Sequence, residues 1–91
     1  MLLNRISNAC EITVRNLQEY LTSNLKTLRL YEGLTQEQVS EIAMISRSTY
    51  SRIESGKATP DLQVLCLLAD YYEIGIDLLV GTDLKKSMRK Q

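Results

Sequence analysis

The 91-residue sequence predicts an all-α fold. Along most of the chain, apolar residues recur three or four positions apart, which is the repeat of an amphipathic helix. Helix-start and helix-stop signals lie between these stretches, and no segment has the pattern of a strand. A single proline and five aromatic residues, all of them tyrosine, also fit a compact helical protein better than a sheet.

The first 21 residues carry an apolar stripe with helical spacing. Its members are Leu3, Ile6, Cys10, Val14, Leu17 and Leu21. The stripe predicts an added helix over residues 1–21 that covers apolar surface on its own domain or across a dimer. The surface expected for it is a second stripe on a later helix, formed by Val64, Leu67 and Tyr71. A frayed extension remains the alternative, because the β-branched run at 12–14 weakens helix propensity.

A domain of five helices is expected over residues 22–82. Its first helix should begin at Thr22 or Ser23 and end at Gly33, with Leu21, Leu25 and Leu28 facing inward. The second should begin at Gln36, after a capping box. Its inward residues are Val39, Ile42 and Ala43.

The capping box consists of Thr35 and, three residues later, Gln38. After a three-residue turn, Ser46 is placed to cap a third helix that begins at Arg47. Tyr50 and Ile53 should turn inward on this helix. Gly56 then supplies a left-handed stop.

The segment Thr59-Pro60-Asp61 is a start signal for the fourth helix, with threonine as the cap and proline at the first helical position. This helix should extend to Tyr72. Its expected buried residues are Leu62, Leu65, Leu68, Ala69 and Tyr72. A short fifth helix over 76–80 should stop at Gly81, and the basic tail 83–91 is expected to be disordered.

Two charged residues occupy inward-facing helical positions. Arg29 lies four residues after Leu25, and Glu54 lies four residues after Tyr50. A lone buried charge is costly, whereas two opposite charges can satisfy each other. The spacing therefore predicts a structural ion pair between Arg29 and Glu54. The alternative is that both side chains extend to solvent.

The outer face of the third helix consists of small hydroxyl side chains and guanidinium groups. These residues are Arg47, Ser48, Thr49, Ser51, Arg52 and Ser55. A face with so little bulk can enter the major groove of B-DNA, where arginine can reach guanine edges or phosphates. The alternative is an ordinary solvated polar face.

Composition and charge narrow the possible functions. Apolar residues make up 44% of the chain and charged residues 24%, which is ordinary for one globular domain. The formal net charge is zero, but Arg47, Arg52 and Lys57 cluster around the third helix, so the local field can be positive. There is no histidine, no carboxylate cluster and no glycine-rich phosphate loop. An enzyme, a bound metal and a cofactor are therefore not expected.

The N-terminal segment lacks the apolar core of a signal peptide, and no apolar run approaches the roughly 18 residues of a membrane span. A cytoplasmic protein is therefore expected, without a membrane partner or a small-molecule effector domain. Cys10 and Cys66 lack metal-ligand spacing and are expected to be reduced and buried.

Several short motifs occur together between Leu25 and Gly81. They are Leu28-Arg29, Gly33-Leu34-Thr35-Gln36, Ile45-Ser46-Arg47-Ser48-Thr49, Arg52-Ile53-Glu54, Gly56, Pro60 and Ile74-Gly75-Ile76-Asp77-Leu78-Leu79. Because these motifs occur in this order, the chain resembles the Cro and phage-repressor type of helix-turn-helix regulator, also called the xenobiotic-response-element (XRE) family. The resemblance implies a lambda-repressor-like five-helix DNA-binding domain. The added N-terminal helical extension lies outside the match and is predicted by its own apolar stripe.

The resemblance also implies roles for individual residues. Arg47, Ser48 and Arg52 match positions that meet base edges, and Thr49 matches one that can touch a thymine methyl group. Gln36 and Ser55 match positions that bind phosphate. The arginine and glutamate positions pair in related repressors, and dimers form through the segment 76–80. Two departures occur in the motif, since Ser40 replaces a usual alanine and Met44 replaces a usual turn glycine that can require a positive φ.

Two functions are consistent with this pattern. The first is a sequence-specific transcriptional regulator, most simply a repressor, that binds double-stranded DNA as a homodimer on a two-fold operator. The second is an antitoxin or co-regulator that uses the same fold to bind a partner protein. The arginine and hydroxyl groups of the third helix favour the first function, whereas an apolar face would have favoured the second.

Overall fold

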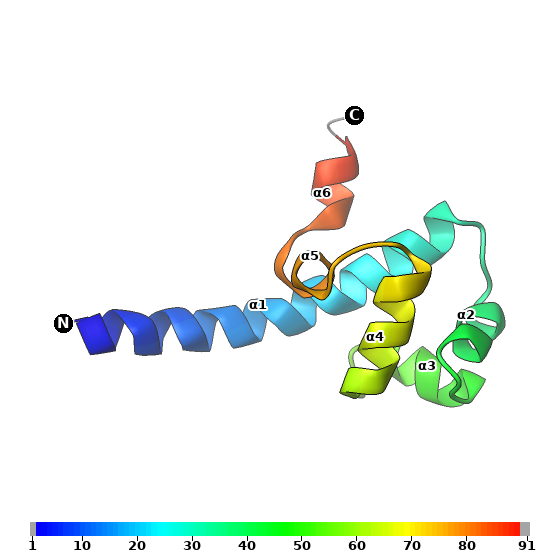
Figure 1. Ribbon diagram of the computed structural model, residues 1–91, viewed down its shortest axis with the longest axis horizontal. Helices are drawn as coiled ribbons and strands as arrows, with labels where there is room; N and C mark the ends of the chain where they lie inside the picture. Colours follow the sequence, from blue (N-terminus) through cyan, green and yellow to red (C-terminus); the bar gives the residue numbers. More distant parts are fainter. Residues whose placement is uncertain (1, 90–91) are drawn as a thin grey trace.

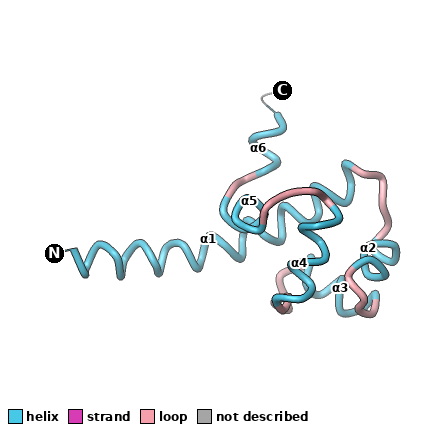
Figure 2. The backbone as a smooth tube through the Cα atoms, in the orientation of Figure 1, coloured by secondary structure: helices cyan, strands magenta, loops and turns pink. Residues whose placement is uncertain are grey.

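The computed structural model describes the backbone of residues 2–89 and the side chains of residues 17–86. The described residues form helices and connecting loops, without a strand (Figure 2). The helices are α1 (Leu2–Tyr31), α2 (Gln36–Ile42), α3 (Arg47–Glu54), α4 (Leu62–Tyr71), α5 (Ile76–Gly81) and α6 (Leu84–Arg89). The predicted all-α fold is therefore confirmed. Among the described residues, none of the helices has the length and apolar character that crossing a bilayer requires.

The helix α1 is the axis around which the other helices gather (Figure 1). Its C-terminal half contacts α3, α5 and α6, while its N-terminal half runs on past them. Thirty helical residues span about 45 Å at 1.5 Å per residue. This length accounts for the longest dimension of the molecule, 47 Å.

A small apolar core joins α1 to the next four helices. Its members are Leu21, Leu25, Val39, Ala43, Tyr50, Ile53, Val64, Leu68, Ala69 and Leu79. The helices α2, α3 and α5 have six to eight residues each, and helices this short are marginal in water by themselves. They are stable here because each contributes a side chain to the shared core.

The helix starts around the turn follow from local sequence signals. At α2, Gln38 N donates to Thr35 Oγ1 over 3.1 Å and Thr35 N donates to Gln38 Oε1 over 2.8 Å, which completes the predicted capping box. At α3, Ser46 caps the helix as predicted. Gly56 has a φ of +83°, the left-handed conformation expected of it.

Two predicted helix starts are wrong. The helix α1 begins at Leu2 and passes through Thr22 and Ser23 without a break. Thr22 Oγ1 instead donates to the backbone carbonyls of Gln18 and Glu19, a bond that a threonine inside a helix can make. The helix α4 begins at Leu62 and not at Pro60, because the carboxylate of Asp61 accepts from Val64 N over 2.9 Å and replaces Thr59 as the cap.

The inward face of α4 also differs from the prediction. Leu62 is 70% exposed although it was expected in the core, and Val64 is buried although it was assigned to a second surface stripe. Cys66, expected to be buried, is exposed, since it lies two residues from Val64 and hence across the helix. Cys10 lies outside the described side chains. Residues 84–89, expected to be disordered, form α6.

One buried amide holds the C-terminal helices against α1. The side chain of Asn24 is fully buried, and its Nδ2 donates to the carbonyls of Leu79 and Thr82 at 2.6 Å each. Its Oδ1 accepts from the backbone N–H of Leu84 at 3.0 Å. These bonds satisfy the carbonyls at the end of α5 and an amide at the start of α6, groups that helix ends leave without intrahelical partners.

The substitution Asn24→Ala should lower the free energy of unfolding by about 1–3 kcal/mol, because it removes three hydrogen bonds from a buried site. Chemical denaturation measures this change, and amide hydrogen exchange at Leu84 should accelerate. Lys26→Ala, two residues further along α1 and exposed, is the matched control and should change stability by less than about 0.5 kcal/mol. Equal effects of the two substitutions would contradict the role given to Asn24.

Candidate nucleic-acid interface

The turn between α2 and α3 fixes the angle at which α3 is presented. Met44, in this turn, has a φ of +60°, so the left-handed conformation occurs at the position where the resemblance places glycine. The conformation costs a non-glycine residue about 1 kcal/mol. The backbone N–H of Ile45 donates to the carbonyl of Ser40 over 3.0 Å, which closes the turn. The Met44 side chain is 75% exposed and needs no space in the core.

Ser40, the other departure in the motif, is accommodated by a local bond. Its side chain is 3% exposed, and its Oγ donates to the carbonyl of Glu37 over 2.7 Å. A buried hydroxyl with such a partner costs little relative to alanine. The helix α2 therefore keeps its packing despite the serine.

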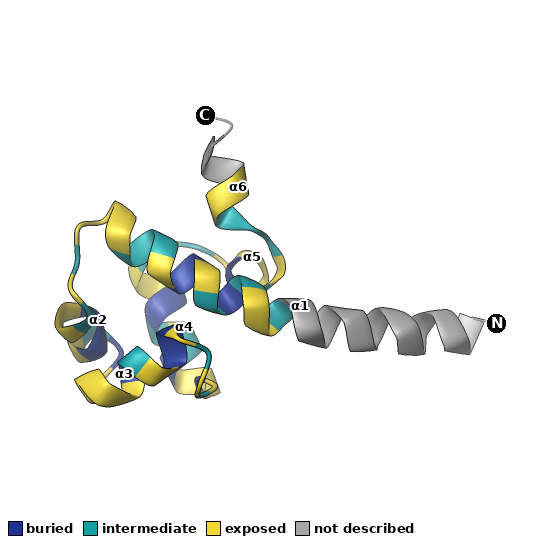
Figure 3. Cartoon of the chain, turned by 180° about the vertical axis from the view of Figure 1, so that it is seen from behind, coloured by how far each residue is buried: buried dark blue, intermediate teal, exposed yellow. Residues whose placement is uncertain are grey.

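The outer face of α3 is exposed and carries no large apolar side chain (Figure 3). Tyr50, Ile53 and Glu54 are buried on the inner face. At about 100° per residue, Ser48, Arg52 and Ser55 lie opposite this inner face, while Arg47 and Thr49 lie toward its edges. All five of these side chains are exposed, whereas Ser51 is half-buried.

Hydroxyl groups at the start of α3 bond to one another. Ser46 Oγ accepts from the backbone N–H of Thr49 over 3.1 Å, donates to Thr49 Oγ1 over 2.8 Å and lies 3.2 Å from Ser48 Oγ. The orientation of the Thr49 hydroxyl is therefore set by the cap, and its methyl group is left for outside contacts. This network was not predicted, although three hydroxyl residues within four positions of a helix start could have indicated it.

The basic groups of this face have no acidic partner nearby. No carboxylate among residues 17–86 lies within salt-bridge distance of Arg47, Arg52 or Lys57. All three side chains are exposed, on α3 or in the loop that follows it. Two guanidinium groups and an ammonium group are thus free to bind an anion or a base edge.

The predicted ion pair between Arg29 and Glu54 is present, and its side chains are largely shielded from solvent. The Arg29 Nε lies 2.9 Å from Glu54 Oε2 and its Nη2 lies 2.8 Å from Oε1, the two-pronged geometry that arginine forms with a carboxylate. The side chains are 13% and 4% exposed. The pair joins the C-terminal part of α1 to the end of α3.

The same cluster reaches the start of α2. Arg29 Nη1 donates to the carbonyl of Leu34 over 3.0 Å, and Gln36 Nε2 donates to Glu54 Oε1 over 3.4 Å. Gln36, one of the predicted phosphate-binding residues, is therefore half-buried and has a structural partner in Glu54. An arginine has five N–H donors, which is more than one carboxylate can accept. The contact from Arg29 to the carbonyl of Leu34 could have been expected from this surplus of donors.

The charges and hydroxyl groups of this cluster shift one another's ionisation. Burial alone would raise the pKa of Glu54, but the hydrogen bonds from Arg29 bring it below the ordinary value. The hydrogen bond to Glu54 likewise raises the pKa of Arg29. Burial raises the pKa of Tyr72 to about 12, and burial followed by the nearby Glu54 raises that of Tyr50. The pair is therefore fully charged near neutral pH.

The arrangement offers an exposed polar surface for binding. Within the described part of the chain, no three side chains of a metal-binding kind lie together. The structure exposes Arg47, Ser48, Thr49 and Arg52 on α3 and leaves Ser51 half-buried. Ser55 and Lys57 follow α3 and are exposed, and half-buried Gln36 lies at the neighbouring helix start.

Comparisons with known proteins agree with this geometry. A helix-turn-helix family model matches residues 25–79. The HTH-type transcriptional activator BcrR of Enterococcus faecalis is 39% identical over 61 residues, which are 66% of this chain and 30% of BcrR. The HTH-type transcriptional regulator AnsR of Bacillus subtilis is 31% identical over 67 residues, or 74% of this chain and 58% of AnsR. The chain thus spans less than two thirds of these relatives.

A solved structure has the same fold. The crystal structure of a transcriptional regulator from Listeria innocua superposes with a TM-score of 0.65 at 29% sequence identity. The superposition covers 77% of this chain and 73% of that regulator.

The substitutions Arg29→Ala and Glu54→Ala should each lower the free energy of unfolding by about 3–5 kcal/mol, because each leaves a buried charge without its partner. The double variant should lose less than the sum of the two, as a double-mutant cycle from chemical denaturation would show. Arg52→Ala, an exposed arginine on the same helix, is the matched control. Small additive effects would mean that the pair contributes no more than an exposed one.

The ion pair between Arg29 and Glu54 should also make the free energy of unfolding depend on pH. Because the pKa of Glu54 is lowered on folding, its contribution is complete above the ordinary carboxyl value of 4.5 and is lost as the pH falls through the lower folded value. Glu54→Gln should flatten this part of the profile, so that stability measured by chemical denaturation at a series of pH values falls less steeply below the ordinary carboxyl value of 4.5.

Proposed function

This chain belongs to the XRE/Cro-type family of helix-turn-helix transcriptional regulators, and from that membership we propose that it represses transcription by binding a two-fold DNA operator as a dimer. In this proposal α3 lies in the major groove, while the start of α2 lies against the phosphate backbone. The observation that carries the proposal is the outer face of α3, which is exposed, small in bulk and equipped with unpaired guanidinium groups.

The position of each side chain on α3 suggests its role. Ser48 and Arg52 lie at the centre of the exposed face and would meet base edges, with Arg52 able to bind guanine through two hydrogen bonds. Arg47 and Thr49 lie toward the edges and would reach a neighbouring base or a thymine methyl group. Half-buried Ser51 would contribute through close contact with the groove wall.

The phosphate contacts would come from residues beside the recognition helix. Gln36 at the start of α2, together with Ser55 and Lys57 after α3, would hold the backbone and set the register. The Gln36 side chain is already held by Glu54, so it would be presented in a fixed orientation. Because the whole chain has a net charge of zero, we expect modest non-specific affinity and a larger share of binding from specific contacts.

A role as an antitoxin or co-regulator fits the surface less well. Binding of a partner protein by the same face would call for apolar anchors, and the large exposed apolar side chains of the described residues lie elsewhere than on α3. One of them, Met44, lies in the turn before α3. The relative BcrR is named an activator, so the sign of regulation needs its own measurement.

The operator selected from a random DNA pool should contain two inverted half-sites about 10 base pairs apart, centre to centre, because two copies would read successive major grooves on one side of the duplex. A reporter gene placed behind that operator should be expressed less when the protein is present. An asymmetric site bound by one copy would contradict the dimer, and increased expression would contradict repression.

The substitution Arg52→Ala should cost about 1–3 kcal/mol of binding free energy and relax the preference at one base pair, because a bidentate contact to guanine is lost. Arg47→Ala should behave in the same way at a neighbouring position. Lys57→Ala is the matched control and should weaken binding equally for all sequences, with a smaller salt dependence. Unchanged binding by both arginine variants would exclude α3 as the recognition helix.

A further inference from the structure

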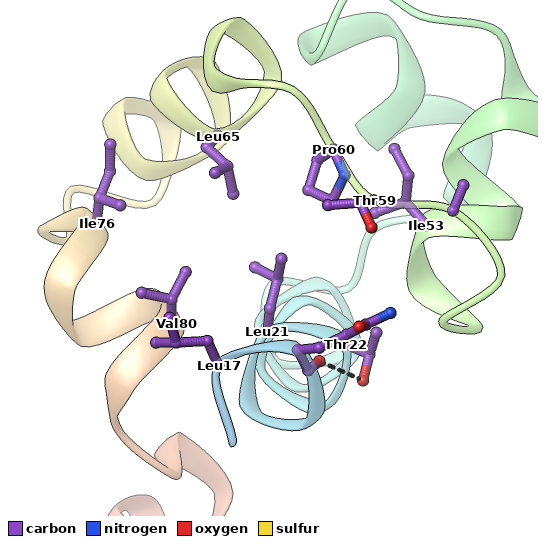
Figure 4. A pocket seen from close by; sticks show the side chains of 11 residues that line it. Leu17, Leu21, Thr22, Ile53, Thr59, Pro60, Leu65, Ile76 and Val80 are labelled. Carbon is purple, nitrogen blue, oxygen red and sulfur yellow. Dashed lines mark hydrogen bonds between the residues drawn. The ribbon is translucent and has the colours of Figure 1, made fainter. Parts of the chain in front are cut away.

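An apolar groove lies between α1, α4 and α5, on residues that the proposed DNA contacts do not use. Its volume is about 430 Å³. Figure 4 shows Leu17 and Leu21 of α1 on one side of it, with Val80 of α5 beside Leu17, and Leu65 of α4 on the other side between Ile76 and Pro60. Most of these side chains remain half-exposed, so the groove is open to solvent.

The groove is continuous with the apolar stripe of α1. Leu17 and Leu21 line the groove, and the spacing of Leu3, Ile6, Cys10 and Val14 puts these residues on the same face of one unbroken helix. This is the face that packs on the core further along, at Leu25. The stripe therefore continues the core-facing side of α1 beyond the point where the domain ends.

The stripe cannot fill the groove of its own chain. The helix α1 is continuous from Leu2 to Tyr31, and a rise of 1.5 Å per residue places Leu3 about 21 Å along the axis from Leu17. Folding back would require a break in the helix, and no proline or glycine occurs in this part of the sequence to favour one. The same stripe on a second copy of the chain is apolar, as the groove is, and it can reach the groove without a break in the helix.

We propose that the groove of each copy receives the N-terminal half of α1 from a second copy, so that two α1 helices pack antiparallel around a two-fold axis. In this arrangement Leu3 and Ile6 of one copy lie beside Leu17 and Leu21 of the other. Each copy contributes one stripe and one groove, and the contact is made twice. Fifteen residues of helix span about 22 Å, and the contact extends over this length in both copies.

This inference rests on the proposed function to the extent that a two-fold operator needs a dimer, but the two can fail separately. The groove and the stripe lie on different residues from the recognition face of α3. A change in the stripe should therefore alter assembly and leave the base preference of a single domain intact.

The full chain should sediment as a dimer, and Ile6→Glu should raise the dimer dissociation constant at least about 100-fold, since each dimer loses two buried apolar side chains and gains two charges. Asn8→Glu, on the opposite face of α1, is the matched control and should leave the dimer intact. Binding to a half-site, measured alongside, should show the same base preference for all three proteins. Equal assembly of the two variants, or a wild-type monomer, would overturn the proposal.

A disulfide would locate the contact. In a Cys10→Ser, Cys66→Ser background, Ile6→Cys places a thiol on the stripe and Gln18→Cys places one at the groove. These two positions are about 18 Å apart along one helix, too far for a disulfide within a chain. In the antiparallel register that sets Leu3 beside Leu21, position 6 of one copy lies opposite position 18 of the other, so mild oxidation should join the two copies. Glu41→Cys on α2 is the control and should not cross-link; cross-linking there to the same extent would overturn the docking.

Discussion

The ion pair between Arg29 and Glu54 is the constraint on which the orientation of α3 depends. Apolar burial is not directional, and an eight-residue helix held only by Tyr50 and Ile53 could rotate or slide at small cost. A buried carboxylate permits no such freedom, because moving it off its guanidinium partner leaves two charges uncompensated. Since Arg29 also binds the carbonyl of Leu34 and Glu54 also binds Gln36, this cluster fixes α1, α2 and α3 together.

Features that depend on nearby residues could be predicted from the sequence. The capping box at Thr35, the cap at Ser46 and the left-handed Gly56 each involve groups within a few positions of one another. The pairing of Arg29 with Glu54 was also predictable, because two opposite charges on inward helical faces have few other ways to be satisfied. The exposed face of α3 followed once its inner face was known.

Features that depend on competition between alternatives could not be predicted in the same way. Thr59 and Asp61 both offer a capping oxygen, and the choice between them sets the start of α4, where Leu62 is exposed. Asn24 lies among the inward residues of α1, but its bonding partners come from carbonyls and an amide far along the chain. Without those partners in view, neither the clamp nor the ordering of α6 follows from the sequence pattern.

The continuity of α1 has a consequence for how this sequence can vary in length. Loops absorb added or missing residues, but each residue inserted within a helix rotates everything before it by about 100° relative to everything after it. One insertion between Val14 and Leu21 would turn the early stripe away from the side that packs on the core, whereas an insertion of seven would nearly restore it. The stretch should therefore tolerate exchange of its outward residues far better than any single-residue change in its length.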